Sequence, residues 1–123
     1  MLGNQNIMAF VATVDAARAR PFYESVLGLK VKDVDDYGTM FDANGNYLRM
    51  SIVREFKPAP YSVLSWEVAD IHAMITGLVA GGVVFEQFQG LGQDEAGVWT
   101  APNGTKVAWF KDPDGNMLSL TQF

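Results

Sequence analysis

The sequence contains no cysteine and a single histidine, His72. The absence of cysteine excludes disulfides, thiol nucleophiles and zinc–thiolate centres. With one imidazole, a metal site built on several histidines is equally hard to form. A chain without cysteine also fits the reducing cytoplasm, and we expect a cytoplasmic protein.

Two classes of partner are poorly supported by the composition. The chain has 9 Lys and Arg against 14 Asp and Glu, a net charge of −5, and its basic residues are scattered. Nucleic-acid binding needs basic residues gathered in a patch, so we expect no nucleic-acid partner. No apolar run reaches the roughly 18 residues that a membrane-spanning helix needs, so we expect no membrane partner.

The sequence does contain an internal repeat. In each half, an apolar segment typical of a buried strand (7–14 and 61–68) precedes an aspartate that is placed to cap an amphipathic helix. These residues, Asp15 and Asp70, are 70 − 15 = 55 positions apart. The turn segments 42–46 and 112–116, each followed by an alternating strand, are 112 − 42 = 70 positions apart. The second half therefore carries 70 − 55 = 15 extra residues, most of which we assign to the glycine-rich stretch 89–97.

The helices and the remaining strands complete two similar units. The predicted apolar helix faces are Ala19, Phe22, Tyr23, Val26 and Leu27 in the first helix, and Ile71, Met74, Ile75, Leu78 and Val79 in the second. Pro21 removes a hydrogen bond inside the first helix, which predicts a kink or a loose first turn. Further strands are predicted at 37–41, 47–53, 84–88, 98–101, 106–111 and 117–122. We expect a single α+β domain, 1–123, with βαβββ modules at about 5–56 and 61–123.

Three segments carry a resemblance to a known family. They are Phe22-Tyr23 with Val26-Leu27-Gly28-Leu29, then Val68-Ala69-Asp70, and finally residues 109–116, Trp-Phe-Lys-Asp-Pro-Asp-Gly-Asn. In this order on a βαβββ repeat they resemble the vicinal-oxygen-chelate superfamily, which includes glyoxalases, bleomycin-resistance proteins and dioxygenases. The resemblance covers nearly the whole chain. It implies two modules in tandem whose curved sheets form an open, barrel-like cleft, and a homodimer.

The resemblance also implies where metal ligands would lie. Metal-dependent members of the family place one ligand on the first strand of each module and one on the strand after each turn. The corresponding positions here are Met8, Arg49, Val63 and Ser119, and both repeat offsets agree with this placement, since 63 − 8 = 55 and 119 − 49 = 70. None is a good ligand for a hard or borderline divalent cation, which prefers carboxylate, imidazole or amide oxygen. We therefore expect no metal centre of the family type and no other cofactor.

Strand alternation predicts which side chains face the cleft instead. The expected ligand-binding residues are Met8, Phe10, Tyr47, Arg49, Val63, Ser65, Glu67, Trp99, Trp109, Met117 and Ser119. Arg49 has two interpretations: it holds an anionic group of a ligand, or it forms an internal ion pair with Glu67 or another acid. Glu67 is a candidate general base, or simply the partner of Arg49 or a solvated residue. His72 is expected at the surface.

Three functions follow from these residues. The first is a protein that binds, and thereby sequesters, a small organic molecule without a metal, as bleomycin-resistance members of the family do. The second is a metal-independent isomerase or lyase that uses Arg49 and Glu67 as catalytic residues. The third is a metal-dependent glyoxalase or dioxygenase. Because the family contains enzymes and binding proteins, the resemblance leaves open whether a reaction is catalysed.

Overall fold

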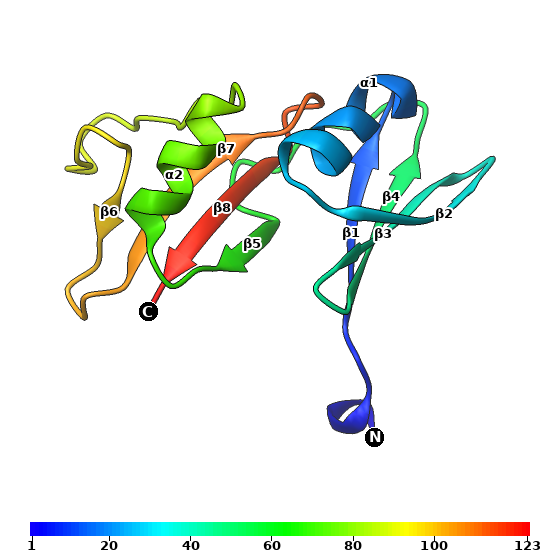
Figure 1. Cartoon of the computed structure of the whole chain (residues 1–123), viewed down its shortest axis with the longest axis horizontal. Helices are drawn as coiled ribbons and strands as arrows, with labels where there is room; N and C mark the ends of the chain where they lie inside the picture. The colour runs from blue at the N-terminus through cyan, green and yellow to red at the C-terminus, as the bar shows by residue number, and fades with distance from the viewer. The chain divides into compact units, whose positions relative to one another are not determined.

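The computed structural model describes all residues, 1–123, and divides into two compact units, Met1–Lys57 and Pro58–Phe123. Figure 1 shows that each unit contains one sheet and one main helix. We call these units the first and second modules.

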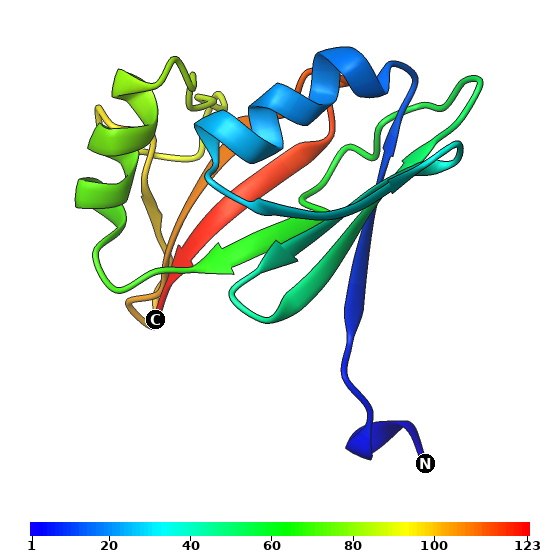
Figure 2. The same ribbon diagram turned by 45° about the vertical axis from the view of Figure 1, so that its right-hand side comes forward.

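The first module is built on a four-stranded sheet. Its strands are β1 (Met8–Thr13), β2 (Lys30–Asp35), β3 (Gly38–Ala43) and β4 (Asn46–Ile52), in the order β1-β4-β3-β2. β1 is parallel to β4, and the other pairs are antiparallel. A short 3-10 turn, Leu2–Asn4, precedes the sheet, and Figure 2 shows it apart from the rest of the module.

Helix α1 (Ala16–Pro21) begins where the sequence predicts. The side chain of Asp15 accepts a hydrogen bond from the backbone N–H of Arg18, which is the expected N-cap. At Pro21 the α-helical hydrogen bonding ends, because proline has no N–H to donate. The chain continues as a π-helical turn, Phe22–Val26, and the N–H of Leu27 donates to the carbonyl of Phe22 at 2.9 Å. The predicted irregularity at Pro21 thus takes the form of a change of helix type.

The second module repeats this order. Its elements are β5 (Leu64–Glu67), α2 (Ile71–Ala80), β6 (Trp99–Thr100), β7 (Lys106–Lys111) and β8 (Met117–Gln122), and its sheet has the order β5-β8-β7-β6. β5 and β8 are parallel, as are β1 and β4. The side chain of Asp70 accepts a hydrogen bond from the N–H of Ala73 and so caps α2. The predicted α+β fold of two βαβββ modules is confirmed.

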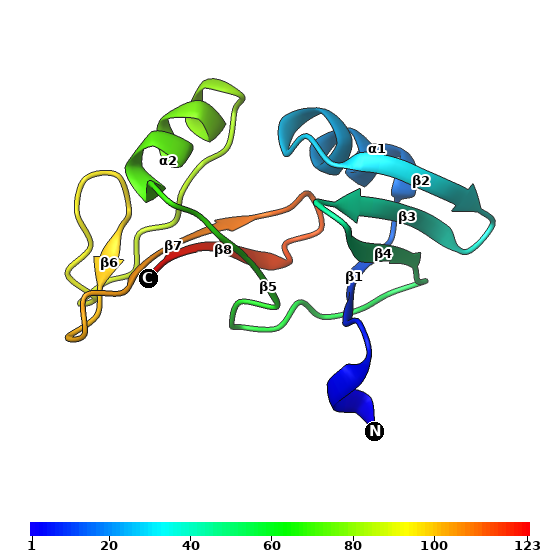
Figure 3. The same ribbon diagram turned by 60° about the horizontal axis from the view of Figure 1, so that its bottom comes forward.

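Each helix lies on one face of its own sheet (Figure 3), and the core of each module fills the space between them. The buried apolar residues of the first module include Val11, Ala19, Tyr23, Leu29, Phe41, Leu48 and Met50. Those of the second include Ile71, Ile75, Val83, Val98, Ala108, Phe110, Met117, Leu118 and Leu120. The predicted face of the second helix is only partly correct, because Met74 and Val79 are exposed.

The extra residues of the second module interrupt its outer strand. In the first module, β2 runs beside β3 from Lys30 to Asp35. In the second, the outer chain pairs with β7 first through an isolated bridge between Phe85 and Phe110, and then through β6 at Trp99–Thr100. Residues 87–98 leave the sheet between these two points. The insertion therefore lies in an edge strand and leaves the inner strands β7 and β8 fully paired.

Three strand predictions need correction. The first module has a strand at Lys30–Asp35 that was not predicted, because its sequence, Lys-Val-Lys-Asp-Val-Asp, is mostly charged and the strand is almost entirely exposed. The strand expected at 84–88 is reduced to the single bridge at Phe85. The segment expected at 61–68 is a strand only from Leu64 to Glu67.

Candidate functional site

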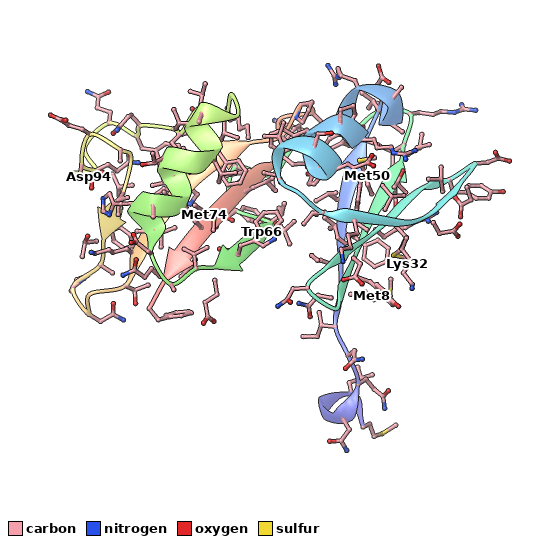
Figure 4. All side chains as sticks on the ribbon, in the orientation of Figure 1. Met8, Lys32, Met50, Trp66, Met74 and Asp94 are labelled. Atoms are coloured by element: carbon pink, nitrogen blue, oxygen red, sulfur yellow. The ribbon has the colours of Figure 1, made fainter.

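The face of the first sheet that lies away from α1 carries the predicted cleft residues. The strand register places Met8 beside Tyr47, Phe10 beside Arg49 and Ala12 beside Ser51. Met8, Phe10 and Tyr47 are exposed, Phe10 by 61%, whereas Val11, Leu48 and Met50 on the opposite face are buried. Figure 4 shows Met50 close to α1 and Met8 and Lys32 away from it. The first sheet thus has an apolar exposed face, as strand alternation predicts.

Arg49 forms an ion pair inside this sheet. Its Nη2 donates to Oδ1 of Asp35 at 2.8 Å, and the Arg49 side chain is only 15% exposed. The same oxygen of Asp35 accepts hydrogen bonds from the backbone N–H groups of Tyr37 and Gly38 at the β2–β3 turn. The hydrogen bond from Arg49, followed by that from Tyr37, lowers the pKa of Asp35 below its ordinary value. Of the two interpretations of Arg49, the ion pair is present, and its acid is Asp35.

Lys32 adds a second positive charge to this face. The β2–β3 register shifts between Val31 and Asp33, which leaves Lys32 at a bulge. Its Nζ lies 5.6 Å from the centroid of the Tyr47 ring, within the range of a cation–π contact. The charges of Lys32 and Asp35 were missing from the sequence-based site because the strand that carries them was not predicted.

The equivalent face of the second sheet is more polar and more aromatic. The register joins Ser65, Ser119 and Trp109 in one row, and Glu67, Thr121, Val107 and Trp99 in the next. The hydroxyl groups of Ser65 and Thr121 lie 2.8 Å apart. Glu67 is exposed and forms no ion pair, whereas Met117 and Ser119 are buried. The predicted site residues of this module therefore share a face of the sheet but differ in their exposure to solvent.

Three aromatic rings lie together on this face. The ring centroids of Trp99 and Trp109 are 6.3 Å apart, and those of Phe88 and Trp109 are 5.6 Å apart with the rings nearly perpendicular. Phe88 comes from the inserted segment and was not among the predicted site residues. Its exposed fraction is 40%. A phenylalanine in a glycine-rich loop is a weak sequence signal, because only the fold shows that it meets Trp109.

Hydrogen bonds hold the inserted segment in a defined conformation. The Gln93 side chain accepts from the N–H of Phe88 at 2.6 Å and donates to the carbonyls of Glu86 and Gly97. Asp94, which lies beside β6 in Figure 4, contacts His72 Nε2 at 2.7 Å and accepts from the N–H of Val98. Desolvation raises the pKa of Asp94, but these hydrogen bonds outweigh it, so its pKa is lowered. His72 is at the surface, as predicted.

The residues at the metal positions of the family do not fit a divalent cation. In the first module, Met8 offers a thioether, and Arg49 brings a positive charge that is already paired with Asp35. In the second module, Val63 offers no donor atom, and the hydroxyl of Ser119 is 2.8 Å from that of Ser62. No group of three or more His, Asp or Glu side chains is arranged to hold a metal ion. The donor chemistry of these four positions therefore disagrees with a family-type centre.

A hollow of about 470 Å³ lies elsewhere in the first module. It is lined by residues 28–30 and 42–45. Its lining combines small residues (Gly28, Ala43, Gly45) with polar ones (Lys30, Asp42, Asn44). None of the predicted site residues lines it, so the exposed sheet faces remain the candidate site.

The sequence model of the Glyoxalase/Bleomycin resistance protein/Dioxygenase superfamily matches residues 6–120. The chain therefore belongs to this superfamily, as its motifs suggest. No match is found among curated protein sequences. No helix is long and apolar enough to cross a membrane.

Solved structures support the fold. A glyoxalase family protein from Enterococcus faecalis has a TM-score of 0.78 and 19% identity, and the match covers 98% of this chain and 99% of that one. Lactoylglutathione lyase from Agrobacterium tumefaciens has a TM-score of 0.72 and 17% identity, with 96% and 93% covered. A glyoxalase/bleomycin resistance protein from Catenulispora acidiphila has a TM-score of 0.70 and 22% identity, with 96% and 97% covered.

Proposed function

We propose that this protein binds a small organic molecule on its exposed sheet faces, without a metal ion at the family positions, and so sequesters it. The observation that carries the proposal is the set of residues at those positions, Met8, Arg49, Val63 and Ser119. Two of them already form polar contacts inside their own modules, Arg49 with Asp35 and Ser119 with Ser62. The other two are apolar side chains that suit contact with an organic ligand.

The first sheet offers apolar area that a ligand would cover. Met8, Phe10 and Tyr47 are neighbours on one face, and each is more than one third exposed. Covering such a side chain contributes roughly 1–2 kcal/mol in proportion to the area removed from water. Arg49 retains further N–H donors beyond the one used by Asp35, but the Asp35 carboxylate offsets its charge. This face therefore favours an apolar ligand with a hydrogen-bond acceptor.

A thermal-shift screen against metabolites and antibiotics tests this proposal. A true ligand raises the unfolding temperature in a concentration-dependent manner, because it binds only the folded chain. Substituting Phe10→Ala should weaken the shift, whereas Phe123→Ala, also at an exposed phenylalanine, should leave it unchanged. If folded, purified protein gives no shift across the whole panel, the binding proposal is rejected.

A metal-independent isomerase or lyase is the second candidate. It is favoured by Glu67, a carboxylate that is exposed and forms no ion pair, and by the partly buried guanidinium of Arg49. Arg49→Ala and Glu67→Gln should each lower turnover of a substrate found in the screen while the fold persists. Unchanged turnover in both variants would remove these two residues from any mechanism.

The remaining parts of the proposal are a homodimer in the cytoplasm and the absence of a metal-dependent activity. The dimer is proposed from the family resemblance, and light scattering coupled to size-exclusion chromatography measures it directly.

A metal-dependent glyoxalase or dioxygenase is the third candidate function. Elemental analysis of purified protein distinguishes it, because one equivalent of Zn, Ni, Fe or Mn per chain would contradict the assignment of the four positions.

A further inference from the structure

We propose that the aromatic patch of the second module, formed by Phe88, Trp99 and Trp109, binds a planar aromatic molecule that carries a positive charge, and that Glu67 receives this charge. The inference rests on the proposed function, since it names the class of ligand and the face that binds it. It also assigns a binding role to Phe88, which belongs to the inserted segment.

The three aromatic rings of the patch lie in contact and can pack against a flat molecule. Trp109 contacts both other rings, Phe88 edge-on at 5.6 Å and Trp99 at a tilt of 40° and 6.3 Å. Aromatic pairs prefer such offset and edge-to-face arrangements. A planar ring placed on the patch would gain the same contacts.

Side-chain hydrogen bonds fix the conformation of the segment that carries Phe88. A single glutamine, Gln93, binds the N–H of Phe88 and the carbonyls of Glu86 and Gly97. At the other end of the segment, the Asp94 carboxylate accepts a hydrogen bond from the N–H of Val98 and contacts His72 on α2. An apolar ring that is 40% exposed on a tethered segment is available to a ligand without a prior rearrangement.

Glu67 supplies the charge preference. It lies on the same face as Trp109, because Glu67 pairs with Thr121 while Trp109 pairs with Ser119 two residues away. β5 and β7 are separated by β8, and the two residues are also offset by two positions along the strands, so they lie roughly 12 Å apart. The Glu67 side chain and a two-ring aromatic with a short charged arm can together span this distance. Two further charged residues near this face, Lys111 and Glu86, form an ion pair with each other.

The faces of the indole rings favour the same charge. The electron-rich faces of tryptophan attract cations, and the chain as a whole carries a net charge of −5. An anionic aromatic would instead be repelled by Glu67. The charge distribution therefore selects a cation over a neutral or anionic molecule of the same shape.

Three naphthalene compounds test the proposal, because they share one ring system and differ in charge at neutral pH. They are 2-naphthylmethylamine, 2-naphthylmethanol and 2-naphthoate, titrated by calorimetry into the full chain. We expect the amine to bind about three- to tenfold more tightly than the alcohol, and the naphthoate to bind most weakly. Equal affinity for the amine and the alcohol would overturn the assignment of charge.

Two variants separate the contributions. Glu67→Gln should remove the preference for the amine and leave the affinity for the alcohol unchanged, and Glu55→Gln, at an exposed glutamate of the first module, is its control. Phe88→Ala should weaken binding of all three compounds by about tenfold, with Phe123→Ala as its control. If Phe88→Ala binds as tightly as the parent protein, the aromatic patch is not the site.

The remaining outcomes distinguish this inference from the proposed function. A ligand found in the thermal-shift screen whose affinity is insensitive to Phe88→Ala and Glu67→Gln would overturn this inference and leave the proposed function intact. An absence of any ligand in the screen, together with no binding of the three naphthalene compounds, would reject both. Self-association that is lost in Phe88→Ala, without naphthalene binding, would assign the patch to contact between two copies of the chain and overturn the ligand proposal.

Discussion

The substitution Leu48→Ala tests whether the core of the first module supports the whole chain. Leu48 lies on β4 and is 2% exposed. The change removes three carbon atoms, which costs about 2.4 kcal/mol in transfer free energy, and the cavity left behind brings the expected loss to roughly 3 kcal/mol. For a chain of this length, each kcal/mol lowers Tm by about 4 °C, so Tm should fall by about 12 °C.

The distribution of tryptophan allows the unfolding of the second module to be followed by itself. Trp66, Trp99 and Trp109 all belong to the second module, so tryptophan fluorescence reports its unfolding alone. Far-ultraviolet circular dichroism reports both modules. A module of about 60 residues buries a smaller share of its surface than the full chain and is marginal by itself, so we expect both signals to shift together.

Two results would refute this reasoning. If dichroism shifts while the fluorescence midpoint stays, the modules unfold independently and the chain is not a single domain. If both midpoints fall by less than about 3 °C, the loss is below about 1 kcal/mol and Leu48 does not pack as described. Leu2→Ala is the matched control, because Leu2 is 83% exposed and its loss should cost no more than about 0.5 kcal/mol.

Two further predictions concern the hairpin between β2 and β3. A Cβ at Gly38 would overlap the main-chain carbonyl oxygen of Met50, so Gly38→Ala should destabilise the chain by about 1–3 kcal/mol in denaturant titrations. The control is Gly77→Ala inside α2, where the space around the glycine is open. This substitution should stabilise the chain by about 0.5–1 kcal/mol. A stable Gly38→Ala protein would contradict the close approach of β3 and β4. Because the folded-state pKa of Asp35 is lowered, its pair with Arg49 stabilises the protein above about pH 4 and loses this effect as pH falls further, through the lowered pKa. The stability difference between the parent and Asp35→Asn should therefore shrink between about pH 5 and pH 2, and a constant difference would mean that the pair does not contribute.

The repeat made most of the fold predictable. Asp15 and Asp70 signal helix starts through local chemistry, and each caps the predicted helix. The turns at 42–46 and 112–116 are also local features, and each precedes a confirmed strand. These local signals predict the structure correctly because neither the cap nor the turn depends on distant parts of the chain.

Strands without a buried face were not predictable in this way. β2 has one partly buried position, and its other five residues are exposed, four of them charged, so it lacks the apolar alternation by which strands are identified. It forms because β3 offers a neighbouring ladder of hydrogen bonds. The segment at 84–88 is the converse case, since three of its five residues are apolar but it leaves the sheet after one bridge.

The candidate site was likewise predictable only where its geometry depends on a single strand. Alternation correctly placed Met8, Phe10 and Arg49 on one face, because it requires only the strand itself. The pairing of Arg49 with Asp35 depends on the hairpin register and on a strand that was not predicted. The contact between Phe88 and Trp109 depends on the hydrogen bonds of Gln93, which no periodicity reveals.

The interruption of the outer strand in the second module has a consequence for how such a protein can change. Residues 87–98 lie between two short contacts with β7, so their length and composition can vary while every inner hydrogen bond is kept. The first module retains the uninterrupted arrangement and provides a template for a shortened version. The two modules thus meet different demands: the first keeps the uninterrupted sheet, and the second has a segment whose surface chemistry is free to change. For protein engineering, the segment is a place to graft new specificities, as variable loops are grafted on a fixed framework.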